Sequence, residues 1–456
     1  MRLIPVFALC ALVACSPVPS LEVSKNFVED SGVSPARPAI QGFAIAPGTP
    51  TQRSNLEIAV DFRDLEFRME SGRSLPALTR FDGPITIALA GDVPGTARTD
   101  LSQLMARFRS EAGLDVRMAD PARQASITIN FHPRAEMQRI VPTAACFVVP
   151  RASTLAEYRA RRNTPFVDWA TLTRREAVSI FVPSDTSPQE VRDCLHEEMA
   201  QAMGPLNDLY RLSDSVFNDD NFHTVLTGFD MLMLRLHYAP ELSNGMNEAE
   251  VAKRLPGLLA RLNPAGEFGG THPGQIAPRS WNDAVASAFG RRGSGGRAAG
   301  ADAMLAIAMA QGWRDSRLGF AYFAKGRVNA ASDPQTAIAA FSQAAQIYRS
   351  LPGAAIHTAH VDMQMAALAL SAGQPAQAVQ FVDRALPAVQ RAQNASLLAT
   401  LMLVKAEAFE ALGRDAEART LRLDSQAWAR YGFGADAQVR ARTSEISALA
   451  ARGQRS

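Results

Sequence analysis

The sequence predicts a mixed α/β domain followed by an all-helical domain built from repeats. Four short segments between residues 85 and 182 are typical of strands, and two of them, 85–89 and 126–131, alternate with the period of two that marks a half-buried strand. Helical patterns lie between and after these segments. The last third of the chain is rich in alanine and repeats one pattern every 40 or 41 residues. The fold class is therefore α+β for the N-terminal part and all-α for the C-terminal part.

The first fifteen residues are organised like a bacterial lipoprotein signal peptide. Arg2 supplies the positive charge, and residues 3–13 form an apolar run that is too short to span a bilayer. Cys15 follows Leu-Val-Ala, as in a lipobox. We expect cleavage before Cys15, acylation of this residue (palmitate is one such chain) and a periplasm-facing lipid anchor. Ser16 favours the outer membrane, and an ordinary secretory signal with a chance cysteine is the alternative.

Composition divides the rest of the chain into four parts. Residues 16–54 are rich in Pro, Ser and Gly and are predicted to be a tether. Residues 55–262 carry the mixed α and β patterns, and residues 263–300 form a Gly- and Pro-rich linker with one short helical piece. Residues 301–450 contain the helical repeats. The formal net charge is +2, so the composition indicates no nucleic-acid partner.

The elements of the α/β domain follow from alternation and from capping residues. Thr99 or Asp100 is expected to cap a helix after the first strand, and Gly113 marks its end. Residues 187–190, Ser-Pro-Gln-Glu, form a capping box that opens a helix ending at Gly204. Strands are expected at 85–89, 126–131, 145–149 and 177–182, and further helices at 227–238 and 248–262.

The helix that ends at Gly204 has the spacing of a zinc-peptidase helix without its metal ligands. A zincin helix reads H-E-x-x-H, because two histidines four residues apart can share a metal beside a glutamate base. With Glu198 in the place of the base, Glu197 and Gln201 occupy the two histidine positions, and Asn207 occupies that of a third histidine. The domain resembles a degenerate zincin. We therefore expect no cofactor and no metal site, with zinc disfavoured.

Glu198 is the candidate catalytic residue. It falls in the apolar stripe of its helix, where a carboxylate is costly unless it is paired, hydrogen-bonded or protonated. Met246 follows a turn that resembles the methionine turn of metzincins. A polar network without catalytic function is the alternative for the same side chains. The expected members around Glu198 are Glu197, Gln201, Asn207, Asp208 and Met246.

Cys146 and Cys194 are predicted to form a disulfide. Of the four cysteines, Cys10 leaves with the signal peptide and Cys15 is the lipidation site. An even pair then remains in an oxidising compartment. The bond would close a loop of about 48 residues, worth roughly 3–4 kcal/mol in the chain-entropy model. Two free buried thiols are the alternative.

Each repeat has a small-residue turn between two amphipathic helices. Ala337, Ala378 and Ala418 occupy equivalent positions in three copies, at steps of 41 and 40 residues. The pattern resembles tetratricopeptide repeats of a long period, which implies a solenoid with a concave groove for a protein or peptide partner. A plain alanine-rich helical bundle is the alternative.

Several motifs between residues 70 and 260 form a specific combination. They are Cys146, Cys194-x-x-Glu197-Glu198-x-x-Gln201-x-x-Gly204, Asn207-Asp208, Ser215-Val216-Phe217-Asn218-Asp219, Thr227 with Asp230, Tyr238-Ala239-Pro240 and Gly245-Met246. Together they resemble the proteobacterial family catalogued as domain of unknown function 2927. The resemblance implies a domain identity and a lipoprotein compartment, and it implies no reaction.

Three functions fit these observations. The first is a non-catalytic protein- or peptide-binding or scaffold lipoprotein. The second is an active metal-dependent hydrolase in which Glu198 is the general base. The third is a purely structural envelope protein. In the hydrolase, the metal ligands would be Glu197 and Asp208 with one of His196, His223 or His237.

Overall fold

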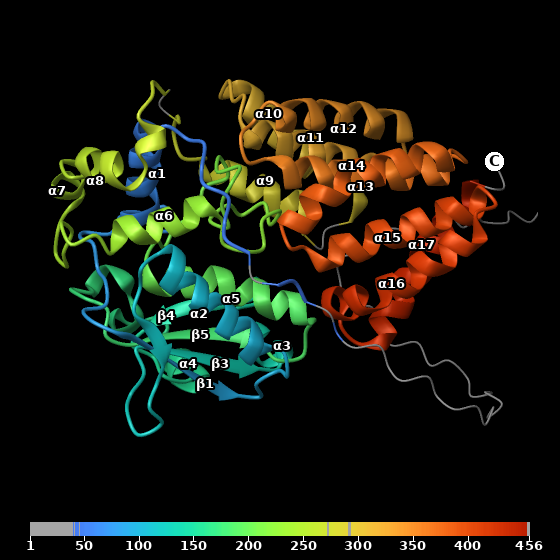
Figure 1. Ribbon diagram of the computed structural model, residues 1–456. Helices are drawn as coiled ribbons and strands as arrows, with labels where there is room; N and C mark the ends of the chain where they lie inside the picture. The colour runs from blue at the N-terminus through green and yellow to red at the C-terminus, as the bar shows by residue number, and fades with distance from the viewer. Residues whose placement is uncertain (1–39, 41, 45, 271–272, 291–292, 454–456) are drawn as a thin grey trace, which may run out of the picture.

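The computed structural model describes residues 40–453 except 41, 45, 271–272 and 291–292 (Figure 1). The predicted signal peptide and Cys15 lie outside the described residues, as do residues 16–39 of the predicted tether. In the part of the chain that is described, no helix combines the length and the apolar character needed to cross a membrane.

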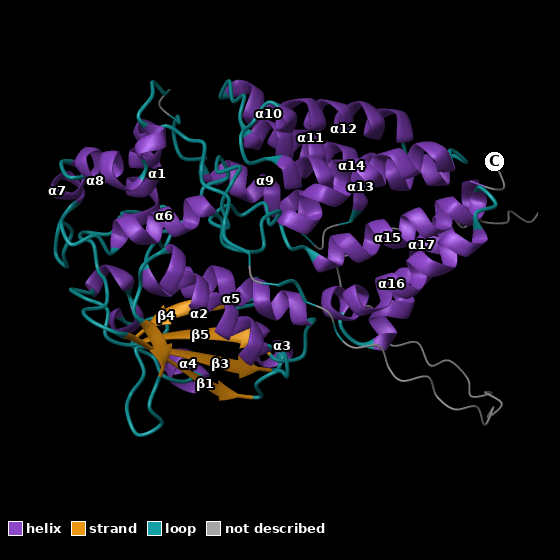
Figure 2. Cartoon of the chain, in the orientation of Figure 1, coloured by secondary structure: helices purple, strands orange, loops and turns teal. Residues whose placement is uncertain are grey.

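A five-stranded mixed sheet forms the base of the N-terminal domain (Figure 2). Four strands run parallel, and the edge strand β4 runs antiparallel to β5. The four predicted strands are confirmed. The sequence does not indicate β2, because three residues are too few to show an alternation. Across the sheet the order is β2 (Val116–Met118), β1 (Ile85–Gly91), β3 (Ile127–His132), β5 (Val178–Pro183) and β4 (Phe147–Pro150).

Helices α2 (Ala97–Glu111) and α5 (Pro188–Met203) lie side by side across one face of the sheet (Figure 1). Their apolar residues and those of the sheet form one large core. A smaller core under β5 and β4 is covered by α3 (Arg134–Gln138) and α4 (Leu155–Arg161). The remaining elements are α1 (Asn55–Glu66), α6 (Gly228–His237), α7 (Glu248–Ala252), α8 (Leu255–Leu262) and the 3₁₀ helices Pro165–Val167, Trp169–Thr171 and Pro264–Gly266.

Two helix boundaries in this domain differ from the prediction. Helix α2 begins at Ala97, before the expected caps Thr99 and Asp100, and Thr96 makes no side-chain cap. Ala97 is fully buried, so packing fixes this start rather than capping. The helix expected at 248–262 is broken in two. Pro256 has no N–H to donate to the carbonyl of Ala252, where α7 ends, and it is tolerated only in the first turn of a new helix, α8.

The C-terminal domain is all-helical and forms a second core. Consecutive helices pack against each other from α9 to α16, and α17 packs against α13 and α15. The helices are α9 (Arg279–Phe289), α10 (Ser294–Ala310), α11 (Ser316–Asn329), α12 (Pro334–Arg349), α13 (Ala355–Ser371), α14 (Pro375–Arg391), α15 (Ala395–Ala411), α16 (Asp415–Phe433) and α17 (Asp436–Gly453).

The structure reveals a fourth copy of the repeat. Helices α10, α12, α14 and α16 begin at residues 294, 334, 375 and 415, which are steps of 40, 41 and 40 residues. Equivalent positions are buried in all four helices. These positions hold Met304, Ala344, Ala385 and Ser425.

The predicted Gly- and Pro-rich linker over 263–300 is therefore wrong from Ser294 onward, where α10 begins. Gly300 lies where α10 crosses α9 closely, and a Cβ there would stand 2.5 Å from the backbone nitrogen of Ala288. The glycine permits close helix packing, which composition alone does not distinguish from flexibility.

The two domains are packed directly against each other through the loop at residues 205–226. Phe222 of this loop lies in the core of the helical domain, where its ring centre is 4.7 Å from those of both His357 and His360. It also contacts aromatic rings on α11 and α12. Asp220 accepts a hydrogen bond from His357 at 2.9 Å. The loop of the α/β domain thus occupies a face of the helical domain that is formed by α11 and α13.

Candidate functional site

Helix α5 is held rigidly at both ends. Ser187 caps its start by accepting a hydrogen bond from the Glu190 backbone N–H at 3.2 Å. The Glu190 carboxylate does not complete the predicted capping box, because it turns to Thr186 and Arg134. At the other end the buried Arg175 guanidinium donates to the carbonyls of Gln201 and Ala202 at 2.8 and 2.7 Å. A cation there also complements the helix dipole.

Five carboxyl groups gather beside α5, and we call them the carboxylate cluster: Glu70, Glu197, Glu198, Asp208 and Asp219. Glu198 is 5% exposed and lies in the predicted stripe with Val191 and Leu195. Glu197 and Asp208 are half-buried, whereas Glu70 and Asp219 are exposed. The cluster therefore extends from the surface to the interior.

No basic side chain neutralises the cluster within the described residues. The carboxyls of Glu70 and Asp208 are hydrogen-bonded to each other, which requires a proton on one of them. Gln201 Nε2 donates weakly to Asp208 Oδ2 at 3.4 Å, and Tyr210 donates to Asp219 at 2.8 Å. Glu198 Oε2 and Asp208 Oδ1 are buried without a hydrogen-bond partner.

Burial and mutual repulsion raise the pKa values of the cluster. Burial, followed by the charges of Asp219 and Glu70, raises the pKa of Glu197 from 4.5 to about 8. Burial and the charge of Glu197 raise the pKa of Glu198 well above its ordinary value. Burial and the Glu70 charge do the same for the pKa of Asp208. At neutral pH the cluster therefore holds protons that an added cation could displace.

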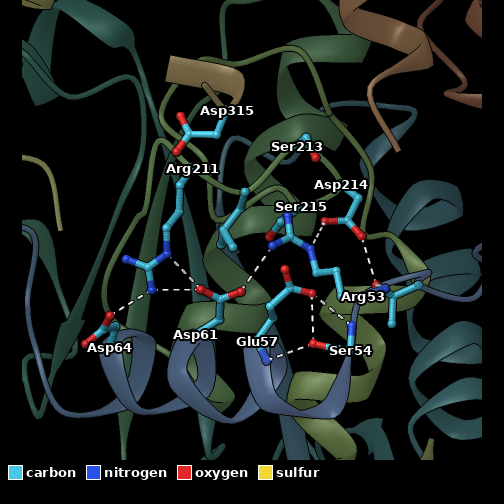
Figure 3. Close-up of polar contacts among 12 residues, drawn as sticks. Arg53, Ser54, Glu57, Asp61, Asp64, Arg211, Ser213, Asp214, Ser215 and Asp315 are labelled. Atoms are coloured by element: carbon cyan, nitrogen blue, oxygen red, sulfur yellow. Dashed lines mark hydrogen bonds and ion pairs between the residues drawn. The ribbon is translucent and has the colours of Figure 1, made fainter. Parts of the chain in front are cut away.

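An ion-pair network fixes the loop that carries Asp208 and Asp219 (Figure 3). Asp61 of α1 is fully buried between two guanidinium groups. Arg211 of the loop donates to it at 2.8 Å, and Arg53 donates to it at 3.1 Å. Arg53 also donates to Asp214 at 2.7 Å. Arg53, which lies within the predicted tether 16–54, thus helps to position the site.

Two predicted site residues lie outside the carboxylate cluster. Asn207 donates its side-chain amide to the Asp64 carbonyl at 2.9 Å, which holds the loop against α1. Met246 is half-buried in a turn, and its own carbonyl accepts a hydrogen bond from the Leu78 N–H at 2.8 Å. The structure therefore brings together Glu197, Glu198, Gln201 and Asp208, and it gives Asn207 and Met246 other contacts.

The three candidate histidine ligands are each bonded elsewhere. His196 Nδ1 accepts from the Leu226 N–H at 3.1 Å, and His237 contacts Glu66 at 2.8 Å. His223 contacts the Ser213 carbonyl at 3.1 Å. Over the described positions, no group of three or more His, Cys, Asp or Glu side chains is arranged to hold a metal ion.

The predicted disulfide is confirmed. Cys146 and Cys194 are bonded, with their Cα atoms 6.0 Å apart. The bond joins the start of β4 to α5 one helical turn before Glu197 and Glu198. It therefore ties the edge of the sheet to the helix that carries the carboxylate cluster.

Sequence reasoning missed Glu70 and Asp219 as site residues. Glu70 stands in a turn after α1, 118 residues before the start of α5, and it looks like any polar turn residue. Asp219 belongs to a polar loop motif, but no spacing rule connects it to Glu197. No sequence signal identifies Arg175 either, because only the folded chain shows that its guanidinium binds the carbonyls at the end of α5.

Between about pH 6 and 7.5 the wild type should lose about 2 kcal/mol of unfolding free energy through Glu197, at 1.36 kcal/mol per pH unit. We predict that Glu197→Gln removes this loss. The pKa of Glu197 is raised from 4.5 to about 8. Its stabilising contribution is thus complete below the unfolded pKa and is lost as the pH rises toward 8. Urea unfolding midpoints at both pH values test this. Asp424→Asn, at an exposed position on α16, should parallel the wild type, and a parallel Glu197→Gln curve would contradict the prediction.

Comparison with known proteins gives one finding. No curated protein and no solved structure matches this chain. The family model described as "Protein of unknown function (DUF2927)" matches residues 55–257, which contain the sheet, α5 and the carboxylate cluster. The α/β domain therefore matches the family that the sequence motifs indicated.

Proposed function

We propose that this chain is a non-catalytic binding protein of the cell envelope, anchored by a lipid at Cys15, whose carboxylate cluster binds the basic side chain of a polypeptide partner. The observation that carries the proposal is the un-neutralised cluster on α5. A Lys or Arg side chain would supply the missing counter-charge, and it would satisfy the unpartnered oxygens of Glu198 and Asp208.

The edge of the sheet supports an extended peptide as the partner. Among the described strands, β4 pairs only with β5, so its outer edge carries no strand. An extended peptide can add to such an edge through main-chain hydrogen bonds. Since the disulfide ties β4 to α5, one peptide could contact this edge and place a basic side chain in the cluster. The face formed by α11 and α13 is less suited, because Phe222 of the same chain fills it.

The chemistry of the site supports a catalytic function less well than a binding function. A general base must be ionised, whereas burial and the Glu197 charge raise the pKa of Glu198 well above its ordinary value. The candidate histidines are also held by other groups. A binding function therefore explains more of these features than a hydrolytic function does.

The test compares peptide libraries that differ in one residue. Random decapeptides with a fixed central Arg, Lys or citrulline are presented to the full chain, since citrulline has the shape of arginine without its charge. The Arg and Lys libraries should be enriched over citrulline in the wild type and not in Glu197→Gln with Glu198→Gln. Binding should strengthen and release protons as the pH rises toward 8. Equal capture of all three libraries would refute the proposal, as would peptide turnover that disappears in Glu198→Gln.

A further inference from the structure

A second polar feature lies at the opposite edge of the sheet. A pocket of about 390 Å³ opens between α2 and the strands β1 and β2. Its polar lining comes from Arg98, Ser102 and Arg109 of α2 and Arg117 of β2, so all of its charged lining residues are arginines. Neither the carboxylate cluster nor the family description involves these residues. The volume falls in the range of small-molecule sites.

The three guanidinium groups are largely free to bind an anion. Arg98 is exposed and makes no ion pair with any described residue. Arg109 uses one N–H, which it donates to the Val116 carbonyl at 2.9 Å. Arg117 is 2.9 Å from Asp115, but the two side chains are 56% and 61% exposed, and such surface pairs contribute little. Three positive charges therefore face the pocket against one carboxylate.

The remaining walls of the pocket are apolar. Leu101 and Met105 of α2 form its floor, together with half-buried Leu89 of β1. Met118 of β2 lies at the pocket and is 48% exposed, although a methionine side chain usually gains from burial. A flexible thioether side chain adapts well to a variable apolar partner. The site thus combines a cationic side with an apolar floor.

We propose that this pocket binds an amphiphilic anion, namely a phosphate or carboxylate group attached to an acyl or alkyl chain. The guanidinium groups of Arg98, Arg109 and Arg117 bind the anionic group by charge-assisted hydrogen bonds. The first carbons of the chain pack on Leu101, Met105 and Met118. A free monoalkyl phosphate and the phosphate of a membrane lipid present the same chemistry to this pocket.

The experiment uses the full chain and probes that separate these contributions. Octyl phosphate carries both parts of the ligand, inorganic phosphate lacks the chain and octyl glucoside lacks the charge. Octyl phosphate, used below its micellar concentration, should bind at least about tenfold more tightly than the other two. The double variant Arg98→Gln with Arg117→Gln should weaken octyl phosphate binding by about tenfold or more, since two charge-assisted contacts are lost. Met118→Ser should weaken octyl phosphate binding and leave phosphate binding unchanged.

Matched controls and vesicles complete the test. Arg139→Gln with Arg159→Gln removes the same charge from exposed positions elsewhere on the domain and should bind octyl phosphate like the wild type. Binding to phosphatidylglycerol vesicles, but not to phosphatidylcholine vesicles, with competition by octyl phosphate, would assign the pocket to lipid. Binding of free octyl phosphate without vesicle binding would assign it to a soluble amphiphile. Equal losses in the two double variants, or no octyl phosphate binding, would overturn the proposal. These variants leave the carboxylate cluster intact, so failure here is separate from failure of peptide binding.

Discussion

Phe222→Ala is expected to lower the free energy of unfolding by about 3–5 kcal/mol, the usual cost of removing a buried phenylalanine ring. Phe222 is 4% exposed. Its ring centre lies 5.1 Å from that of Phe323 and 4.7 Å from that of His357, so one side chain of the α/β domain contacts α11 and α13 together. Truncation leaves a cavity between the domains and also removes edge-to-face aromatic contacts.

Equilibrium urea unfolding of the full chain measures this effect. Tryptophan fluorescence reports both domains, because Trp169 lies in the α/β core and Trp281 in the helical core. The variant should unfold at a lower urea concentration, with the two domains less strongly coupled. Phe268→Ala is the control, since that ring is 53% exposed and its loss should change stability by less than about 0.5 kcal/mol. A similarly small change in Phe222→Ala would show that this contact does not hold the domains together.

Local patterns made much of the fold predictable. Alternation identified two strands and short apolar runs identified two more, and the Ser187 cap with Pro188 located the start of α5. The equivalent alanines Ala337, Ala378 and Ala418 predicted three helices in register, and each of these residues is fully buried. In each case the signal lies within a short segment or repeats at a fixed spacing. Such signals follow from the periodicity of helices and strands.

Contacts between distant segments were not predictable in this way. Phe222 stands in the polar sequence Asp-Asp-Asn-Phe-His, where nothing marks it as the residue that enters the helical core. Gly300 sits in a glycine-rich stretch that resembles a linker, yet it is a close-packing position. Glu70 reaches Asp208 only because the end of α1 is hydrogen-bonded to the loop after α5, through the carbonyls of Asp64 and Leu65. The helix with Glu197 and Glu198 was therefore predictable, whereas the full carboxylate cluster required the three-dimensional arrangement.

The interface also contains a histidine cluster that makes stability fall in acid. Burial, followed by the charges of His357, Arg327 and His223, lowers the pKa of His360 from 6.5 to about 3. Burial and the charge of His357 lower the pKa of His223 as well. Asp220 faces the cluster through His357. The folded chain keeps His360 neutral, whereas the unfolded chain protonates it below pH 6.5.

The stabilising contribution of His360 is therefore complete above pH 6.5 and is lost as the pH falls toward 3. At 1.36 kcal/mol per pH unit, lowering the pH from 6.5 to 4.5 costs about 2.7 kcal/mol through this residue alone. The carboxylate cluster acts in the opposite direction, because its raised pKa values make it most stable in acid. Wild-type stability thus reflects two opposing sets of buried groups, and only a variant separates them.

His360→Gln isolates the histidine contribution, because it keeps a neutral polar side chain at this half-buried position. The difference in unfolding free energy between wild type and His360→Gln should fall by about 2.7 kcal/mol from pH 6.5 to 4.5, as measured by urea unfolding. His132→Gln is the matched control on β3, outside the interface, and its difference from wild type should stay nearly constant.

If His360→Gln also stays parallel to the wild type, protonation of this cluster does not limit the acid stability of the interface. If the expected slope appears, mild acid weakens the contact between the domains while it protects the carboxylate cluster. The same fall in pH would then weaken binding of a basic ligand at α5 and loosen the helical domain from the loop that carries Asp208 and Asp219.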